Sequence, residues 1–285
     1  MDREQLLAIL VLLLCGPATV AAGSWMRPTP TTRGSGRQLE AQAWRCVWRP
    51  LVPASLIAAA LIGWAIAEPD DAEGVGFAPV LVAVGVGAFW LRAIVRGVRS
   101  MIRVAPSGLL AGTVGLLWPR IVIAPQLRGL LDDSTLRAIE LHEQAHARHR
   151  DPLRLWLAQL VTDLQWPIPA APTRLRDWLD ALELARDEEA IRRGADEAAL
   201  AHGIVTCAKL LVHGHDGPVA ACLTREGELL HRRIRRLLDG PLGDEQLPER
   251  GRWVMMTLGL ALLASAVLGA VFGEVVIRAL TGALT

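Results

Sequence analysis

The sequence has no tyrosine and only 3 phenylalanines among its 285 residues. Its 4 cysteines form no Cys-x-x-Cys pair, which argues against a disulfide framework and against a zinc site built from thiolates. The net charge of +1 is too small to indicate a nucleic acid as a direct partner. What remains is a chain that is 52% hydrophobic, and its apolar residues are gathered in long runs that indicate a membrane protein.

Four of these runs are long enough to cross a bilayer, which takes about 20 residues of helix. They cover residues 6–22, 51–67, 77–95 and 253–272. The first could instead be a signal peptide, but Asp2 and Glu4 stand where such a peptide needs basic residues. We therefore expect a mainly α membrane protein with four transmembrane helices, in which residues 1–95 form a three-span region. Residues 253–285 would form the fourth span and a short extracytoplasmic tail.

Loop charges predict the orientation of these spans. Arginines follow the first and third runs, whereas residues 68–73 between the second and third runs contain acids and no base. Because positive loops stay in the cytosol, the N-terminus is expected outside and residues 96–252 in the cytosol.

The cytosolic segment 96–252 is large enough to form a domain with its own core. Two apolar pieces, 108–114 and 120–124, are typical of strands, the second of them an edge strand between prolines. Asp132, Asp133 and Ser134 offer N-caps for a helix that runs to about Arg150. Further helices are expected over 153–166, 173–193, 196–213 and 224–239, so the predicted insert is an α+β domain between spans 3 and 4.

The helix expected before Arg150 contains the sequence His142-Glu143-Gln144-Ala145-His146. Two histidines four residues apart lie on one helix face, so their rings can bind a single ion. Glu143 can reach a water on that ion without occupying a ligand position, as a general base requires. This pattern predicts a catalytic zinc (Zn2+) bound by His142 and His146; accidental histidines on a surface helix are the competing interpretation.

A catalytic zinc needs a third protein ligand and one open position. Glu183 is the best candidate, and Asp187 follows one helical turn later, where it can hydrogen-bond a ligand histidine. Alternatively, both residues belong to a solvated face together with Glu188 and Glu189. His149, His213 and His215 are weaker candidates for the site. A residue that stabilises the oxyanion could be His202, His231 or a nearby arginine, although the run His231–Arg236 is most simply a solvated or headgroup-facing helix side.

Three ordered segments resemble the antirepressor metallopeptidases of the BlaR/MecR type, which are integral-membrane gluzincins. The segments are Gly115–Pro125, Leu136–Pro152 around the two histidines, and Glu183–Asp187. The resemblance implies a gluzincin-type zinc metalloprotease domain with His142, His146 and Glu183 as zinc ligands, Glu143 as base and Asp187 as support. It also implies that a substrate adds as a strand beside Ile121 and that the protein lies in the bacterial inner (cytoplasmic) membrane.

Relatives of this type cut a cytosolic transcriptional repressor, so the expected partner is a cytosolic protein, for example a winged-helix repressor. Family receptors carry a ligand-binding domain after the last span, whereas about a dozen residues follow residue 272 here. The expected trigger is therefore a separate sensor protein or a signal in the lipid bilayer.

Two other functions are compatible with the same motifs. One is a membrane quality-control protease of the HtpX type or a prenyl-protein protease. The expected placement of both motifs between spans 3 and 4 favours cleavage of a cytosolic repressor over this alternative. The other is a signalling scaffold in which zinc only stabilises the fold, and the presence of Glu143 argues against it.

Overall fold

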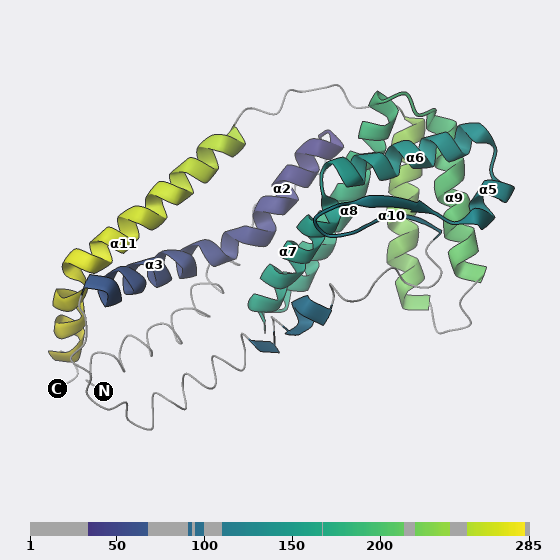
Figure 1. The fold of residues 1–285 in the computed structure, drawn as a ribbon. Coiled ribbons are helices and arrows are strands. Elements are labelled where there is room, and N and C mark those ends of the chain that lie inside the picture. The colour runs from purple at the N-terminus through teal and green to yellow at the C-terminus, as the bar shows by residue number, and fades with distance from the viewer. Residues whose placement is uncertain are drawn as a thin grey trace.

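The computed structural model describes residues 34–67, 91–92, 95–99, 110–166, 168–213, 220–239 and 250–282. Helices dominate this part of the chain (Figure 1). In chain order, the named elements are α2 (Gly36–Trp48), the 3-10 turn η1 (Arg49–Leu51), α3 (Val52–Ala67), β1 (Ala111–Val114), β2 (Arg120–Ile123), α5 (Pro125–Leu130), α6 (Asp133–Arg148), α7 (Asp151–Leu164), α8 (Ala170–Arg192), α9 (Glu197–His213), α10 (Ala220–Leu238) and α11 (Arg250–Gly282).

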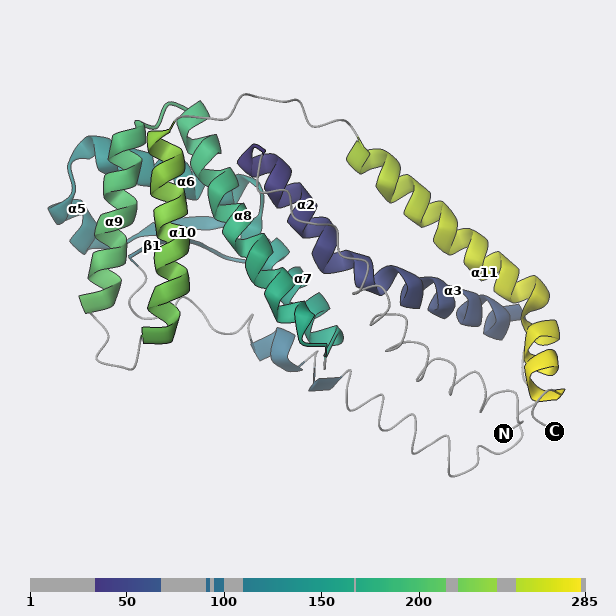
Figure 2. The ribbon, with the colours of Figure 1, turned by 180° about the vertical axis from the view of Figure 1, so that it is seen from behind.

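Helices α3 and α11 pack side by side, away from the cluster of α6 to α10 (Figures 1 and 2). Small residues allow their backbones to approach closely: a Cβ on Gly63 would lie 1.9 Å from the carbonyl oxygen of Ala266. In the same way, a Cβ on Gly269 would lie 1.8 Å from the carbonyl oxygen of Ala60. The outer side of α11 leaves large apolar side chains more than half exposed: Leu260, Leu263, Val267, Leu268, Val271, Phe272 and Val275.

The expectation of four transmembrane helices is wrong. Within the described parts of the chain, no helix combines the length and the apolar character needed to cross a bilayer. The expected span 51–67 corresponds to α3, a continuous helix of 16 residues that begins directly after η1 ends at Leu51. At 1.5 Å per residue this helix is about 24 Å long, short of the ~30 Å hydrocarbon core. The expected span 6–22, and 77–95 apart from residues 91, 92 and 95, lie outside the described residues.

The two strands expected within residues 96–252 are confirmed. β1 and β2 form an antiparallel hairpin in which Thr113 faces Ile121 and Ala111 faces Ile123. The hairpin packs against α6, and the apolar residues Leu127, Leu131 and Ile139 form a small core beneath it.

The expected helices are also confirmed, with ends shifted by a few residues. α6 begins after Asp132, whose side chain accepts a 2.7 Å hydrogen bond from the backbone N–H of Thr135. α6 and α7 are joined by a tight turn in which Arg150 adopts φ 52°, the left-handed region that non-glycine residues rarely occupy. This turn directs the first residue of α7, Asp151, back toward the last turn of α6.

Helix α2 was not foreseen by the sequence analysis. Ser35 begins it with a capping box, in which the Ser35 side chain accepts from Gln38 N–H and the Gln38 side chain accepts from Ser35 N–H. α2 lies along α8, and Val47 joins Ala158, Val161, Leu175 and Trp178 in a core between α2, α7 and α8.

Candidate metal centre

Helix α6 presents His142, Glu143 and His146 on its buried side. Ala138, Leu141 and Ala145 are fully or almost fully buried and fix this face of the helix against the domain. The Nε2 atoms of His142 and His146 lie 3.1 Å apart, and their ring centroids are separated by 4.8 Å.

Helix α8 brings Glu183 to the two histidines. Glu183 Oε2 lies 3.6 Å from His142 Nε2, and Glu183 Oε1 lies 3.7 Å from His146 Nε2. The ligand atoms of the three residues all lie within 4.8 Å of one another, which is a group that could hold a metal ion.

The residues fit a zinc ion in both spacing and chemistry. Two ligands of a tetrahedral zinc, each ~2.0–2.1 Å from the metal, stand about 3.4 Å apart, close to the three separations seen here. The facing nitrogens of His142 and His146 would each carry a lone pair if both rings were neutral with the proton on Nδ1. Such lone pairs repel unless a cation lies between them.

A carboxylate lies next to the outer nitrogen of each histidine. Asp151 Oδ2 accepts a 2.9 Å hydrogen bond from His146 Nδ1. Asp187 Oδ1 lies 3.0 Å from His142 Nδ1, although this contact is poorly aligned for a hydrogen bond. Carboxylates at this position keep the proton on Nδ1 and leave Nε2 free for a metal. Asp187 was foreseen from its spacing to Glu183, whereas the sequence analysis gave Asp151 no role at the site.

Arg233 of α10 completes the site; the sequence analysis left a nearby arginine open as a candidate but did not single out Arg233, whose run it described most simply as a solvated or headgroup-facing helix side. Its guanidinium contacts both oxygens of Asp187 at 2.7 Å and Glu183 Oε2 at 3.0 Å. Its position could have been inferred, because Arg233 lies between Leu230 and Leu237 at the i+3 and i+7 spacing of a buried helix face.

These contacts set the protonation of the metal-free site. Burial alone lowers the pKa of His142, but Asp187 and Glu183 raise it to about 9. Burial opposes the ionisation of Glu183 and Asp187, but the charge of Arg233 and the contact with His142 hold both pKa values below their usual range. The metal-free protein therefore carries a proton on His142 at neutral pH, and a metal ion must displace it.

Glu143 lies beside the three donors and is held by strand β1. The Thr113 hydroxyl lies 2.9 Å from Glu143 Oε2 and 2.9 Å from the Glu143 backbone oxygen, and it can donate to one of them at a time. Thr113 was not singled out by the sequence, since a single threonine in a strand carries no motif.

All of these groups open into a cavity of about 780 Å³. Its walls come from β1, α6, the start of α7, α8, α9 and α10, and they include His142, Glu143, His146, Glu183 and Arg233. Of the described residues that line it, Arg233 is the only arginine or lysine. The strand that lines the cavity is β1, whereas the sequence analysis expected the strand around Ile121, which is β2, to lie beside the cleft.

Three other described histidines have partners outside the group of three donors. His149 is 41% exposed and contacts Glu189 at 2.6 Å, His202 lies 3.5 Å from Thr135 Oγ1, and the exposed His231 contacts Arg235. The side chain of His213 and the whole of residue 215 are outside the described part of the structure. The expectation that Glu188 and Glu189 lie on a solvated face is wrong, since they are 9% and 8% exposed.

Two histidines and a carboxylate around one point, on a helical domain with a small sheet, define a candidate metal-binding site next to a cavity. Residues 110–237, which contain every residue of this site, match the family described as BlaR1 peptidase M56. This match confirms the resemblance of the segment to the BlaR1-type peptidases, a membrane-associated family of metalloproteases. No curated protein and no solved structure matches the chain at a significant level.

Proposed function

We propose that this protein is a zinc metalloendopeptidase that cuts a cytosolic protein in a regulated signalling response. The observation that carries the proposal is the convergence of His142, His146 and Glu183 beside Glu143 and a large cavity. In this proposal the three converging residues bind zinc, and Asp151 and Asp187 hold the two imidazoles in the tautomer that exposes Nε2.

A zinc ion bound there would polarise the scissile carbonyl and acidify a water molecule. Glu143 accepts a proton from the attacking water and then delivers it to the leaving amine nitrogen as the peptide bond breaks. Thr113 orients the Glu143 carboxylate for both transfers. Arg233 keeps a positive charge close to the carbonyl oxygen, on which negative charge grows during the attack. Of His202, His231 and the nearby arginines, which were considered for stabilising this oxyanion, Arg233 is the one that lines the cavity.

A cavity of about 780 Å³ can enclose several side chains of a substrate, which favours an extended polypeptide segment lying along β1. A winged-helix repressor is the proposed substrate, and a separate sensor protein the proposed trigger.

The exposed apolar side of α11 supports contact with a lipid bilayer, since patches of this kind mark membrane or protein contacts. We place the protein at the bacterial inner membrane, with the metal site on its cytosolic side.

The test compares wild type with Glu143→Gln on the purified full-length chain, with casein and a co-encoded repressor as substrates. Glu140→Gln is the matched control, because Glu140 lies on the same helix, is 41% exposed and contacts only Arg137 at 3.9 Å among the ion pairs seen. We expect about one zinc per chain in all three proteins and a loss of cleavage of roughly 10²–10⁴-fold in Glu143→Gln alone. Wild-type protein without zinc, or full cleavage by Glu143→Gln, would contradict the proposal.

A further inference from the structure

Glu40 in α2 is a buried carboxylate far from the chemical step. It is 7% exposed, and it lies outside the segment that matches the peptidase family. Its oxygens contact the guanidinium of Arg186 at 3.4 Å and that of Arg154 at 2.5 Å. A buried charge with two charged partners is costly to maintain, so its connections are informative.

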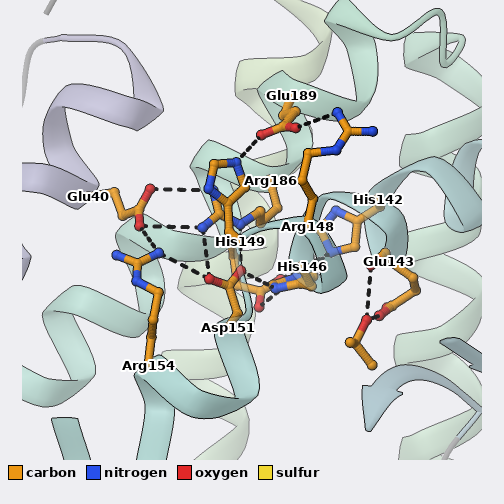
Figure 3. A network of polar contacts seen from close by, with 12 residues as sticks. Glu40, His142, Glu143, His146, Arg148, His149, Asp151, Arg154, Arg186 and Glu189 are labelled. Carbon is orange, nitrogen blue, oxygen red and sulfur yellow. Dashed lines mark hydrogen bonds and ion pairs between the residues drawn. The ribbon is translucent and has the colours of Figure 1, made fainter. Parts of the chain in front are cut away.

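Those connections lead to a metal ligand (Figure 3). Arg186 is 2% exposed and donates to both oxygens of Asp151, from Nε at 2.5 Å and from Nη2 at 2.9 Å. Arg154 contacts Asp151 Oδ1 at 3.0 Å. Asp151 in turn accepts the hydrogen bond from His146 Nδ1. Glu40 is thus linked to His146 through two arginines, Arg154 and Arg186, and the carboxylate of Asp151.

Helix α2 is fixed at the place that this network needs. The backbone N–H of Gly36 lies 2.8 and 2.7 Å from the two oxygens of Glu188, and a Cβ on Gly36 would lie 2.8 Å from the backbone of Leu184 and Ala185. The guanidinium of Arg154 lies over the rings of Trp44 of α2 and Trp178 of α8, 4.9 and 5.5 Å from their centroids, and the two rings contact each other. The docking of α2 therefore sets the position of Glu40 against Arg186.

The charges of this network balance: Glu40 and Asp151 face Arg154 and Arg186. Without Glu40, both arginines would have Asp151 as their shared carboxylate, and its oxygens would be drawn toward them and away from His146 Nδ1. A histidine that loses its carboxylate partner binds a metal less tightly, typically by 10–100-fold.

We propose that Glu40 is a positioning residue of the metal site, which holds Asp151 on His146 through Arg186 and Arg154 and so couples the docking of α2 to metal binding. The inference rests on the proposed function, because it takes His146 as a metal ligand. The coupling is reciprocal: a metal ion on His146 also favours the docked position of α2. A signal that moves α2 would then reach the peptidase site without touching its cavity.

The experiment measures zinc affinity by competition with a chelating dye on the full-length chain, together with the visible spectrum of the Co2+-substituted protein. The variants are Glu40→Gln, Asp151→Asn and the double variant, with Arg37→Gln as the matched control on the exposed side of α2. We expect Glu40→Gln to weaken zinc binding about tenfold and to change the Co2+ spectrum, while Arg37→Gln changes neither. Because Glu40 acts through Asp151, the double variant should bind zinc no more weakly than Asp151→Asn alone.

Additive losses in the double variant, or a Glu40→Gln protein that binds zinc as wild type does, would overturn the inference and leave the proposed function intact. Wild-type protein that binds no zinc would overturn both. If Glu40→Gln does not fold, Glu40→Asp decides the question, because it keeps the charge and shortens the reach to Arg186. An affinity loss between those of Arg37→Gln and Asp151→Asn supports the inference, and an unchanged affinity refutes it.

Discussion

Replacing Arg233 by glutamine removes the cation that neutralises the carboxylates behind the metal site. Asp187, whose side chain is 4% exposed, and Glu183, at 30% exposed, would then share the protonated His142 as a cation, so one of the two negative charges would lose its partner. Removal of one partner from a buried ion pair destabilises a protein by ~3–5 kcal/mol. We therefore expect the metal-free protein to lose that amount of stability, a fall in Tm of roughly 6–20 °C.

Zinc should reverse part of this loss. In Arg233→Gln, a metal ion bound to Glu183 replaces the positive charge that the substitution removes. In wild type, the same ion would be repelled by Arg233, which contacts the same carboxylate. The stabilisation that zinc adds should therefore be larger in Arg233→Gln than in wild type. Thermal unfolding with and without zinc measures both quantities, and Arg232→Gln, at the exposed neighbouring position, is the control. A metal-free Arg233→Gln protein as stable as this control, or a smaller zinc effect than in wild type, would refute the reasoning.

Two further predictions concern the same site. Because Asp187 and Glu183 raise the pKa of His142 to about 9 in the metal-free protein, zinc must displace a proton below that pH. Zinc affinity should then rise about tenfold from pH 7 to pH 8, with a proton released to the buffer; calorimetry in buffers of different ionisation enthalpy measures this, and a flat affinity would contradict it. Thr113→Val should lower kcat roughly tenfold with casein, because the Glu143 carboxylate loses its hydroxyl partner, while zinc content stays at the wild-type value. Thr113→Ser should restore the rate, and equal rates in Thr113→Val and wild type would exclude the orienting role.

The sequence was most informative where functional residues share one helix. His142, Glu143 and His146 form a spacing that has a geometric meaning once the segment is helical, and the same holds for Glu183 and Asp187. Capping residues and prolines also located β2, α6 and α7 within a few residues. Such signals are local: they come from the periodicity of side chains within one helix or strand and from the residues at its ends.

The residues that the sequence analysis missed are those whose partners lie far away in the chain. Thr113 meets Glu143 across 30 positions, and Arg186 meets Glu40 across 146. No spacing rule relates positions on separate elements, so these contacts depend on how α2, β1 and α10 pack around α6 and α8. The expectation of four spans was wrong for a different reason: an apolar run records composition, whereas a span also needs length, and α3 has only 16 residues.

Helix α8 explains why these distant groups act together. It is buried on most of its circumference, and consecutive residues point to different neighbours: Glu183 and Asp187 to α6 and α10, Arg186 to α7 and α2, and Glu188 to α2 and α10. A helix with one apolar side would bury a single face, whereas α8 buries charged residues on several faces and satisfies each with an ion of opposite sign. Since these residues share one rigid backbone, a shift of α8 that suits one neighbour alters the ion pairs with the others. The position of Glu183 at the metal site is therefore tied to the docking of both α2 and α10, and either helix offers a route by which peptidase activity can be controlled from outside the cavity.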